Sequence, residues 1–188
     1  MTAIILAGGK SSRMGRDKAF LKIEGVPMIR RQLKLLRKFF KKITIVTNSP
    51  HKYKFRNVKI IKDIVPGQGP LGGIYSGLMA SKSFHNFVLA CDMPFIDLSL
   101  VRYMCKKARG YDVIIPKIDN RYETLFCIYS QNCKKHIREL LDKKIFKIRR
   151  FFQKVKVRKI TKREVSRFVS CEKIFVNLNT PKDLYRLK

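Results

Sequence analysis

The chain has 188 residues, and 43 Lys or Arg against 13 Asp or Glu give it a formal net charge of +30 at neutral pH. This length suits one domain with a single core, and no apolar run approaches the ~18 residues that a membrane-spanning helix needs. The sequence shows no signal peptide and no C-x-x-C pair among its 5 cysteines, so we expect a soluble cytoplasmic protein without a disulfide framework or zinc site.

The excess of positive charge would attract anions of every kind, nucleic acid included. The cations are nevertheless scattered over the whole sequence, and no zinc finger, RNP motif or basic tract interleaved with aromatic residues is present. Nucleic acid is therefore not the expected partner, and no membrane partner is expected. A basic nucleic-acid-binding protein stays open as an alternative of another class.

Short apolar strands alternate with amphipathic helices along the chain. The expected strands cover residues 3–6, 43–47, 58–61, 86–91, 112–116, 124–129 and 155–160. The expected helices begin at Pro27, pass through Leu78 and Met79, cover 131–141 and 146–152, and begin again at Pro181, while a glycine- and proline-rich loop covers 66–73. This order predicts an α/β fold, with a three-layer, Rossmann-like, mostly parallel sheet and helices on both faces.

Polar or glycine residues follow four of the expected strands. The first strand ends at Leu6 to Gly9, and the next three end at Asn48, Asp63 and Asp92. Because ligands bind beyond the carboxyl ends of the strands in such sheets, we expect these residues to share one crevice.

The segment that follows the first strand has the composition of a phosphate-binding loop. Ala7, Gly8 and Gly9 leave the main-chain N–H groups open to a close ligand, and Arg13 and Lys18 bring cations onto the same loop. These features together predict a polyphosphate as the ligand.

Two commoner phosphate motifs do not account for this loop. A P-loop that ended at Gly9-Lys10-Ser11 would require glycine at position 4, which is Ile4. The sequence from Gly67 to Gly72 fits G-x-G-x-x-G, but Pro66 and Pro70 supply no N–H where a dinucleotide pyrophosphate needs one.

The remaining pattern, L-A-G-G-x-S-x-R-M-G-x-D-K from Leu6 to Lys18, resembles the signature loop of nucleotidyltransferases, and most closely that of molybdenum cofactor guanylyltransferases. Related enzymes that use CTP for the same pterin tend to carry proline at the position of Asp17. Three further segments resemble this family, namely Cys91-Asp92-Met93-Pro94, Gly69 to Gly73, and Phe175 to Leu184. The resemblance thus covers nearly the whole chain.

The resemblance implies a nucleotide-diphospho-sugar transferase-like fold that transfers GMP from GTP to the phosphate of molybdenum-molybdopterin, with release of pyrophosphate. It implies a single domain over 1–188, in which about 1–100 bind the nucleotide and about 101–188 bind the acceptor. Arg13, Lys18 and Asp92 would be catalytic, and Asp92 would hold Mg²⁺. The binding residues would be Leu6, Ala7, Gly8, Gly9, Lys18, Asn48, Asp63 and Asp92, with Asn177 and Asn179 on the pterin side.

Several alternatives stay open. Asp92 could be the N-cap of a following helix, and Asp63 could read the base or the ribose or only initiate a turn. The family often carries proline before Leu-Phe-x-x-Tyr, where this chain has Glu123-Thr124-Leu125, so the acceptor is less well defined than the nucleotide. The runner-up is a relative that uses CTP with the pterin, or that acts on a sugar phosphate, methylerythritol phosphate or cobinamide phosphate. Transient contact with cofactor-receiving enzymes or chaperones is a further expectation.

Overall fold

The computed structural model describes residues 1–8, 18–176 and 178. Within these residues, eight strands form one sheet in the order β10–β7–β9–β6–β1–β4–β5, with β8 paired to β7. The bounds are β1 Thr2–Leu6, β4 Ile43–Thr47, β5 Lys59–Lys62, β6 His85–Ala90, β7 Val113–Ile118, β8 Arg121–Tyr122, β9 Phe126–Ser130 and β10 Val157–Thr161. A short hairpin pairs β2 (Lys22–Ile23) with β3 (Val26–Pro27).

The central part of the sheet is parallel. Strand β1 pairs in parallel with both β4 and β6, and β4 pairs in parallel with β5. Strand β9 runs antiparallel to its neighbours β6 and β7, while β10 is parallel to β7. The expected mostly parallel sheet is therefore confirmed.

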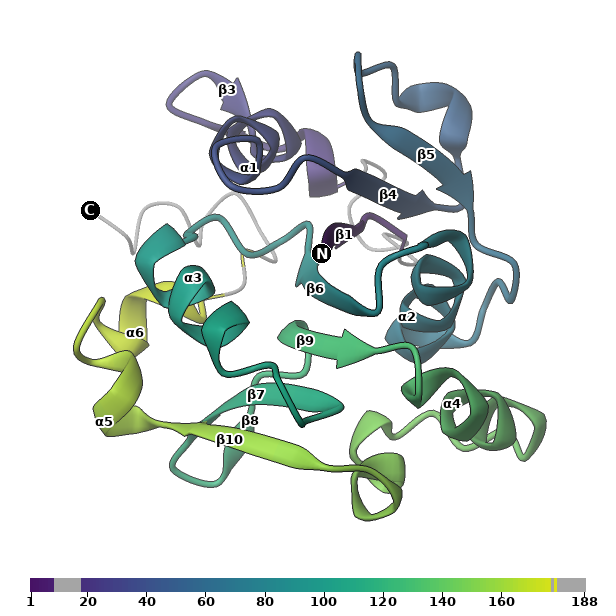
Figure 1. Ribbon diagram of the computed structural model, residues 1–188. Coiled ribbons are helices and arrows are strands. Elements are labelled where there is room, and N and C mark those ends of the chain that lie inside the picture. The colour runs from purple at the N-terminus through teal and green to yellow at the C-terminus, as the bar shows by residue number, and fades with distance from the viewer. Residues whose placement is uncertain (9–17, 177, 179–188) are drawn as a thin grey trace.

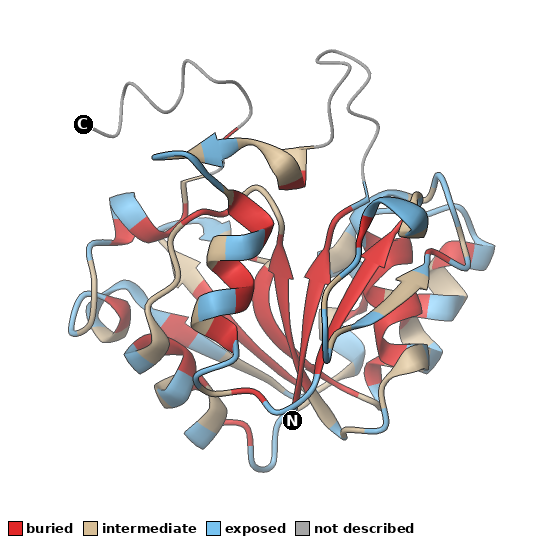
Figure 2. Ribbon diagram, turned by 90° about the horizontal axis from the view of Figure 1, so that it is seen from above, coloured by how far each residue is buried: buried red, intermediate tan, exposed pale blue. Residues whose placement is uncertain are grey.

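Helices cover both faces of the sheet (Figures 1 and 2). One core contains apolar side chains of α1 and α3, and the other contains those of α2 and α4. The helices are α1 Met28–Leu36, α2 Gly69–Ala80, α3 Leu98–Lys106, α4 Cys133–Asp142, α5 Lys162–Val165 and α6 Cys171–Ile174, with 3-10 turns η1 Lys18–Phe20, η2 Pro50–Lys52 and η3 Ile148–Lys154. The three-layer arrangement predicted from the sequence is confirmed.

The first strand shows why its apolar residues do not alternate with polar ones. Ala3 and Ile5 belong to the core beneath α1, whereas Ile4 and Leu6 belong to the core beneath α2. Successive side chains of a strand point to opposite faces, so a strand covered on both sides is apolar throughout.

The segment 66–73 was expected to be a loop, but its second half is helical. Helix α2 begins at Gly69, and Pro70 occupies its first turn, where a missing N–H costs no helical hydrogen bond. A Cβ added at Gly77 would lie 2.6 Å from Cγ2 of Ile4, and one added at Gly73 would lie 3.3 Å from Cδ2 of Leu6. The glycines thus let α2 pack closely on β1 instead of ending the helix.

Other differences are smaller. The helix expected at 146–152 is a 3-10 segment at Ile148–Lys154, and α3 was not predicted. The helix expected from Pro181 lies outside the described residues. Among the helices that the structure describes, none combines the length and apolar character that crossing a bilayer requires.

Candidate active site

A cavity of about 540 Å³ lies beyond the carboxyl ends of β1, β4 and β6. Its lining includes these residues that the sequence predicts for the site: Leu6, Ala7, Gly8, Lys18, Asn48, Asp63 and Asp92. The start of α2 contributes Gly69, Pro70 and Gly73. The parallel sheet therefore brings together residues from four separate strand ends.

Lys18 and Asp92 face each other in this cavity. Nζ of Lys18 lies 3.6 Å from Oδ2 of Asp92, and the two side chains are 28% and 22% exposed. Burial raises the pKa of the Asp92 carboxyl above its ordinary value, and the Lys18 ammonium offsets part of that rise. A carboxylate that is largely desolvated but still reachable from the cavity favours a cationic ligand.

Asp92 does not cap the next helix. The N-cap of α3 is Asp97, whose Oδ1 accepts a hydrogen bond of 2.7 Å from the N–H of Leu100. The Asp92 carboxylate is thus not used to stabilise that helix.

The backbone around Asp92 joins three parts of the chain. The N–H of Cys91 donates to the carbonyl of Leu6 at 3.0 Å, so the turn continues directly from the centre of the sheet. The N–H of Leu178 donates to the carbonyl of Asp92 at 2.9 Å. Leu178 therefore contacts the turn at the rim of the cavity, whereas Asn177 and Asn179 lie outside the described residues.

The Asp63 carboxylate is held firmly at the end of β5. Its Oδ1 accepts hydrogen bonds from the N–H of Val65 at 3.1 Å and from the hydroxyl of Ser76 at 2.6 Å. The residue is 8% exposed and lines the cavity. The bond to Val65 makes it a turn residue, and its other oxygen, Oδ2, takes part in neither bond.

Asn48 and Gly8 lie next to each other on the first two strand ends. A Cβ added at Gly8 would be 3.5 Å from Nδ2 of Asn48, which is ordinary contact. A side chain at position 8 would thus fit, in contact with the amide of Asn48. Gly9 and Arg13, the remaining loop residues predicted for the site, lie outside the described residues.

The N-terminus of α2 is another feature suited to phosphate. The first N–H groups of a helix have no intrahelical acceptor, and the helix dipole adds partial positive charge there. Gly69 and Pro70 line the cavity at this end of a 12-residue helix. Together with Lys18, this helix end makes the cavity favourable for a polyanion.

The residues present fit a magnesium ion. In the part of the chain that the structure describes, no group of three or more His, Cys, Asp or Glu is arranged as a metal cluster. Mg²⁺ does not require such a cluster, because one or two carboxylates plus phosphate oxygens and water complete its coordination. Asp92 offers that carboxylate.

A second and larger cavity, of about 1200 Å³, adjoins the first. Pro70 lines both. Its lining carries the cations Arg121, Lys147, Arg149 and Lys162 and the aromatic residues Tyr122, Phe146 and Phe175. Glu123, where the sequence departs from the family pattern, also lines it and accepts a 2.6 Å bond from Nε of Arg121. A planar anion would find both charge and ring surfaces here.

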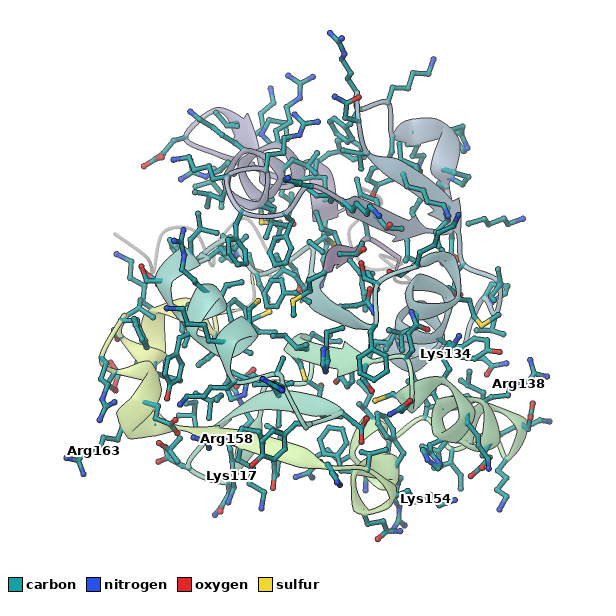
Figure 3. The ribbon with its side chains drawn as sticks, in the orientation of Figure 1. Lys117, Lys134, Arg138, Lys154, Arg158 and Arg163 are labelled. Carbon is teal, nitrogen blue, oxygen red and sulfur yellow. The ribbon has the colours of Figure 1, made fainter. Side chains whose placement is uncertain are left out.

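Other cations of the described residues are spread over the surface. Figure 3 shows Arg138 on α4, Lys154 on η3 and Arg163 on α5 at separate places on the surface. Several of them contact carboxylates, including Arg138 with Asp142 at 2.9 Å and Lys154 with Glu139 at 2.7 Å. This distribution does not favour a nucleic-acid interface.

Gln32 is a further residue of this site, and no motif in the sequence predicts its role. It lies on α1 and is fully buried, and Nε2 donates to the carbonyls of Ala90 and Met93 on either side of Asp92. The sequence does place this polar residue on the apolar face of the helix, with Ile29, Leu33 and Leu36, and that position could have marked it as a buried residue with hydrogen-bond partners.

Comparison with known proteins agrees with this geometry. The family described as "MobA-like NTP transferase domain" matches residues 3–160. A protein of Pelotomaculum thermopropionicum named "Probable molybdenum cofactor guanylyltransferase" is 35% identical over 100% of this chain and 91% of its own length. A protein of the same name from Clostridium perfringens is 41% identical over 95% of this chain and 91% of its own length.

Solved structures show the same fold. The crystal structure of molybdopterin-guanine dinucleotide biosynthesis protein A from Archaeoglobus fulgidus superposes with a TM-score of 0.83 at 25% identity, covering 100% of this chain and 96% of that one. A cytidylyltransferase of 2-C-methyl-D-erythritol 4-phosphate from Thermus thermophilus, at 12% identity and a TM-score of 0.68, covers 98% of this chain and 95% of its own and shares the fold alone. The sheet is thus that of the nucleotide-diphospho-sugar transferases, and this chain belongs to the MobA-like NTP transferase family and, within it, to the molybdenum cofactor guanylyltransferases.

Proposed function

We propose that this protein transfers GMP from GTP to the terminal phosphate of molybdenum-molybdopterin, which releases pyrophosphate and forms the molybdopterin guanine dinucleotide cofactor. Family membership supports this reaction. The observation that carries it is the cavity in which Gly8, Lys18 and Asp92 meet beyond the carboxyl ends of the central strands.

GTP binds in the 540 Å³ cavity in this proposal. The main chain of Leu6, Ala7, Gly8 and Gly9 and the start of α2 surround the phosphates, and Lys18 neutralises part of their charge. Asn48 and Asp63 contact the nucleoside. Because Oδ1 of Asp63 already accepts two hydrogen bonds, only Oδ2 is left for the ligand, which suits one ribose hydroxyl better than the two donors of the guanine edge.

The reaction needs charge stabilisation more than it needs a base. The attacking phosphate of the pterin is already anionic at neutral pH, so the obstacle is repulsion between two polyanions. Arg13 and Lys18 reduce that repulsion and stabilise the charge that gathers on the departing pyrophosphate. A Mg²⁺ ion held by Asp92 would supply further positive charge at the phosphates.

The acceptor binds in the adjoining 1200 Å³ cavity in this proposal. Its cations suit the phosphate of the pterin, and its aromatic side chains suit the planar ring system. Asn177 and Asn179 would contact the pterin from the closing segment. Residues 1–100 would thus form the nucleotide part, and 101–188 the acceptor part, of a single domain.

Pyrophosphate release tests the proposal. Purified protein with Mg²⁺ and GTP should release pyrophosphate only when molybdenum-molybdopterin is added. A nucleotide panel with CTP, UTP and ATP should rank GTP first. A preference for CTP, or turnover with a sugar phosphate, methylerythritol phosphate or cobinamide phosphate in place of the pterin, would move the protein to another branch of the fold.

Thermal unfolding distinguishes the transferase from the alternative, a basic nucleic-acid-binding protein. Mg-GTP at about 100 times its dissociation constant should stabilise the protein by roughly 2.7 kcal/mol. A basic nucleic-acid-binding protein would instead show no protection by GTP and would bind DNA or RNA with an affinity that falls steeply as salt rises. We expect action in the cytoplasm, with transient contact to cofactor-receiving enzymes or chaperones.

A further inference from the structure

The turn that carries Asp92 leaves the hydrogen-bond ladder of the sheet after Cys91, whose N–H donates to the carbonyl of Leu6 at 3.0 Å. Strand β6 ends at Ala90, and the turn from Ala90 to Met93 is closed by a bond of 3.3 Å from the N–H of Met93 to the carbonyl of Ala90. This distance is at the weak end of the range for N–H···O bonds. Apart from the bond of Cys91, the Asp92 backbone is held by the 2.9 Å bond from the N–H of Leu178 to the carbonyl of Asp92.

One side chain from another element bridges the two ends of this turn. Nε2 of Gln32 donates to the carbonyl of Ala90 at 3.0 Å and to the carbonyl of Met93 at 2.8 Å. Both hydrogens of the carboxamide are thus used on the first and last residues of the turn. Helix α1 contributes none of the residues described above for the nucleotide cavity, yet Gln32 ties it to the turn that carries Asp92.

The burial of Gln32 has a cost that packing alone does not explain. The residue is 0% exposed in α1, beside the buried residues Ile29 and Leu33, and its Oε1 is buried without a hydrogen-bond partner among the described residues. A buried acceptor left unsatisfied destabilises a fold, and a methionine of similar size would avoid that loss. What methionine would not supply is the pair of donors to the Asp92 turn.

We propose that Gln32 is a positioning residue for Asp92: its carboxamide holds the carbonyls of Ala90 and Met93 together and so keeps the Asp92 carboxylate opposite Lys18 in the nucleotide cavity. This inference rests on the proposed function, because it assigns Gln32 a role through Asp92 in that reaction. A displacement of about 1 Å of a reacting group can lower a rate by up to about a hundredfold.

The chain offers a matched control in Gln131. Nε2 of Gln131 donates to three backbone carbonyls, those of Leu78, Ser81 and Ser83, and its Oε1 is likewise buried with no partner in the part of the chain that the structure describes. These contacts lie near the start of β6, at the opposite end of the strand from Asp92. Removing the carboxamide of Gln131 should destabilise the fold as removing that of Gln32 does, but it should leave the Asp92 turn unchanged.

The experiment compares Gln32→Met with Gln131→Met in the full chain. We expect Gln32→Met to lower kcat about tenfold to a hundredfold while KM for GTP stays within about threefold, because the lost contacts act on the transition state more than on nucleotide binding. Amide hydrogen exchange in the metal-free protein should become faster at Met93 in Gln32→Met and stay unchanged there in Gln131→Met. An unchanged kcat in a folded Gln32→Met, or equal losses of kcat in both variants, would overturn the inference.

Two more variants separate this inference from the proposed function. Gln32→Glu keeps the shape, and a buried glutamic acid that stays protonated donates one hydrogen, so an intermediate kcat is expected; a kcat as low as that of Gln32→Met in a folded protein would count against positioning by hydrogen bonds. If the wild type releases no pyrophosphate from GTP and the acceptor, the proposed function fails. If the wild type is active and Asp92→Asn leaves kcat unchanged, the role of Asp92 fails, and that of Gln32 fails with it. If Asp92→Asn abolishes activity while Gln32→Met retains it, only the role of Gln32 fails.

Discussion

The ammonium of Lys18 lies 3.6 Å from Oδ2 of Asp92, although η1 and the turn after β6 are far apart in the chain. The pair sits in a cavity with the glycine of the first strand end and the start of α2. An ion pair in which each side chain is about a quarter exposed is poorly hydrated without being sealed from ligands. In this geometry Lys18 can bind phosphate and Asp92 can bind a metal ion with little rearrangement.

Asp92→Asn should abolish most of the transferase activity. The amide is neutral and cannot replace the carboxylate at the phosphates, so we expect kcat to fall by roughly a hundredfold to a thousandfold. Pyrophosphate release with saturating GTP and acceptor measures this.

Asp97→Ala is the matched control, because it lies on the same connection but caps α3. It should lower the free energy of unfolding by about 1 kcal/mol and leave kcat unchanged. If the two variants lost activity to the same extent, Asp92 would act only through stability.

Asp63→Asn should weaken GTP binding without changing nucleotide choice. Oδ1 of Asp63 is occupied by Val65 and Ser76, so the NH₂ group of asparagine would replace Oδ2, the oxygen left to accept a bond from the ligand, and the negative charge of the carboxylate would be lost. We expect KM for GTP to rise about tenfold, the effect of losing about 1.4 kcal/mol of binding. The ratio of kcat/KM for GTP to that for CTP should be preserved. A collapse of that ratio would instead assign Asp63 to the guanine base.

Gly77→Ala should destabilise the fold, although alanine is the better helix former. The added Cβ would meet Cγ2 of the buried Ile4 at 2.6 Å, so α2 or β1 has to shift. Overpacking of this kind costs about 1–3 kcal/mol, more than the ~1 kcal/mol gained in helix propensity. Urea unfolding measures the difference, and Ile4→Val in the same background, with less bulk beside the new methyl, should recover part of it. A midpoint above that of the wild type would contradict the close approach of α2 to β1.

Glu164 should stabilise the fold in a way that depends on pH. Burial by itself raises the pKa of Glu164, but hydrogen bonds from Thr161 and Tyr103 and the charge of Arg158 outweigh it and lower the pKa from 4.5 to about 2. A carboxyl with a lowered pKa in the folded state contributes stability above pH 4.5 that is lost as the pH falls toward 2.

Glu164→Gln should therefore lower the free energy of unfolding by about 1–2 kcal/mol at pH 7, and the difference from the wild type should shrink steadily below pH 4.5. Glu24→Gln is the control, because Glu24 pairs with Arg31 on the surface with its side chain 80% exposed and should contribute little. A wild-type advantage that persisted at pH 2 would mean that Glu164 acts by packing and not by charge.

The sequence by itself determined the alternation of strands and helices and the positions of the strand ends. Buried strands such as Ala3 to Leu6 are apolar throughout because both of their faces are covered, and that property is visible in a short window. Since parallel strands end on the same edge of a sheet, it also followed that Gly8, Asn48, Asp63 and Asp92 would come together. The recurrence of family motifs at these ends then pointed to the reaction.

Only the tertiary structure decided the contacts between distant segments. Glycines in a sequence usually interrupt helices, and only the packing of Gly77 against Ile4 explains why α2 tolerates them. Asp97, and not Asp92, caps the N-terminus of α3. Gln32 on α1 donates to the carbonyls of Ala90 and Met93, which lie 58 and 61 positions further along the chain. Local patterns record how each segment buries its own side chains, whereas these pairings depend on which segments the folded sheet brings into contact.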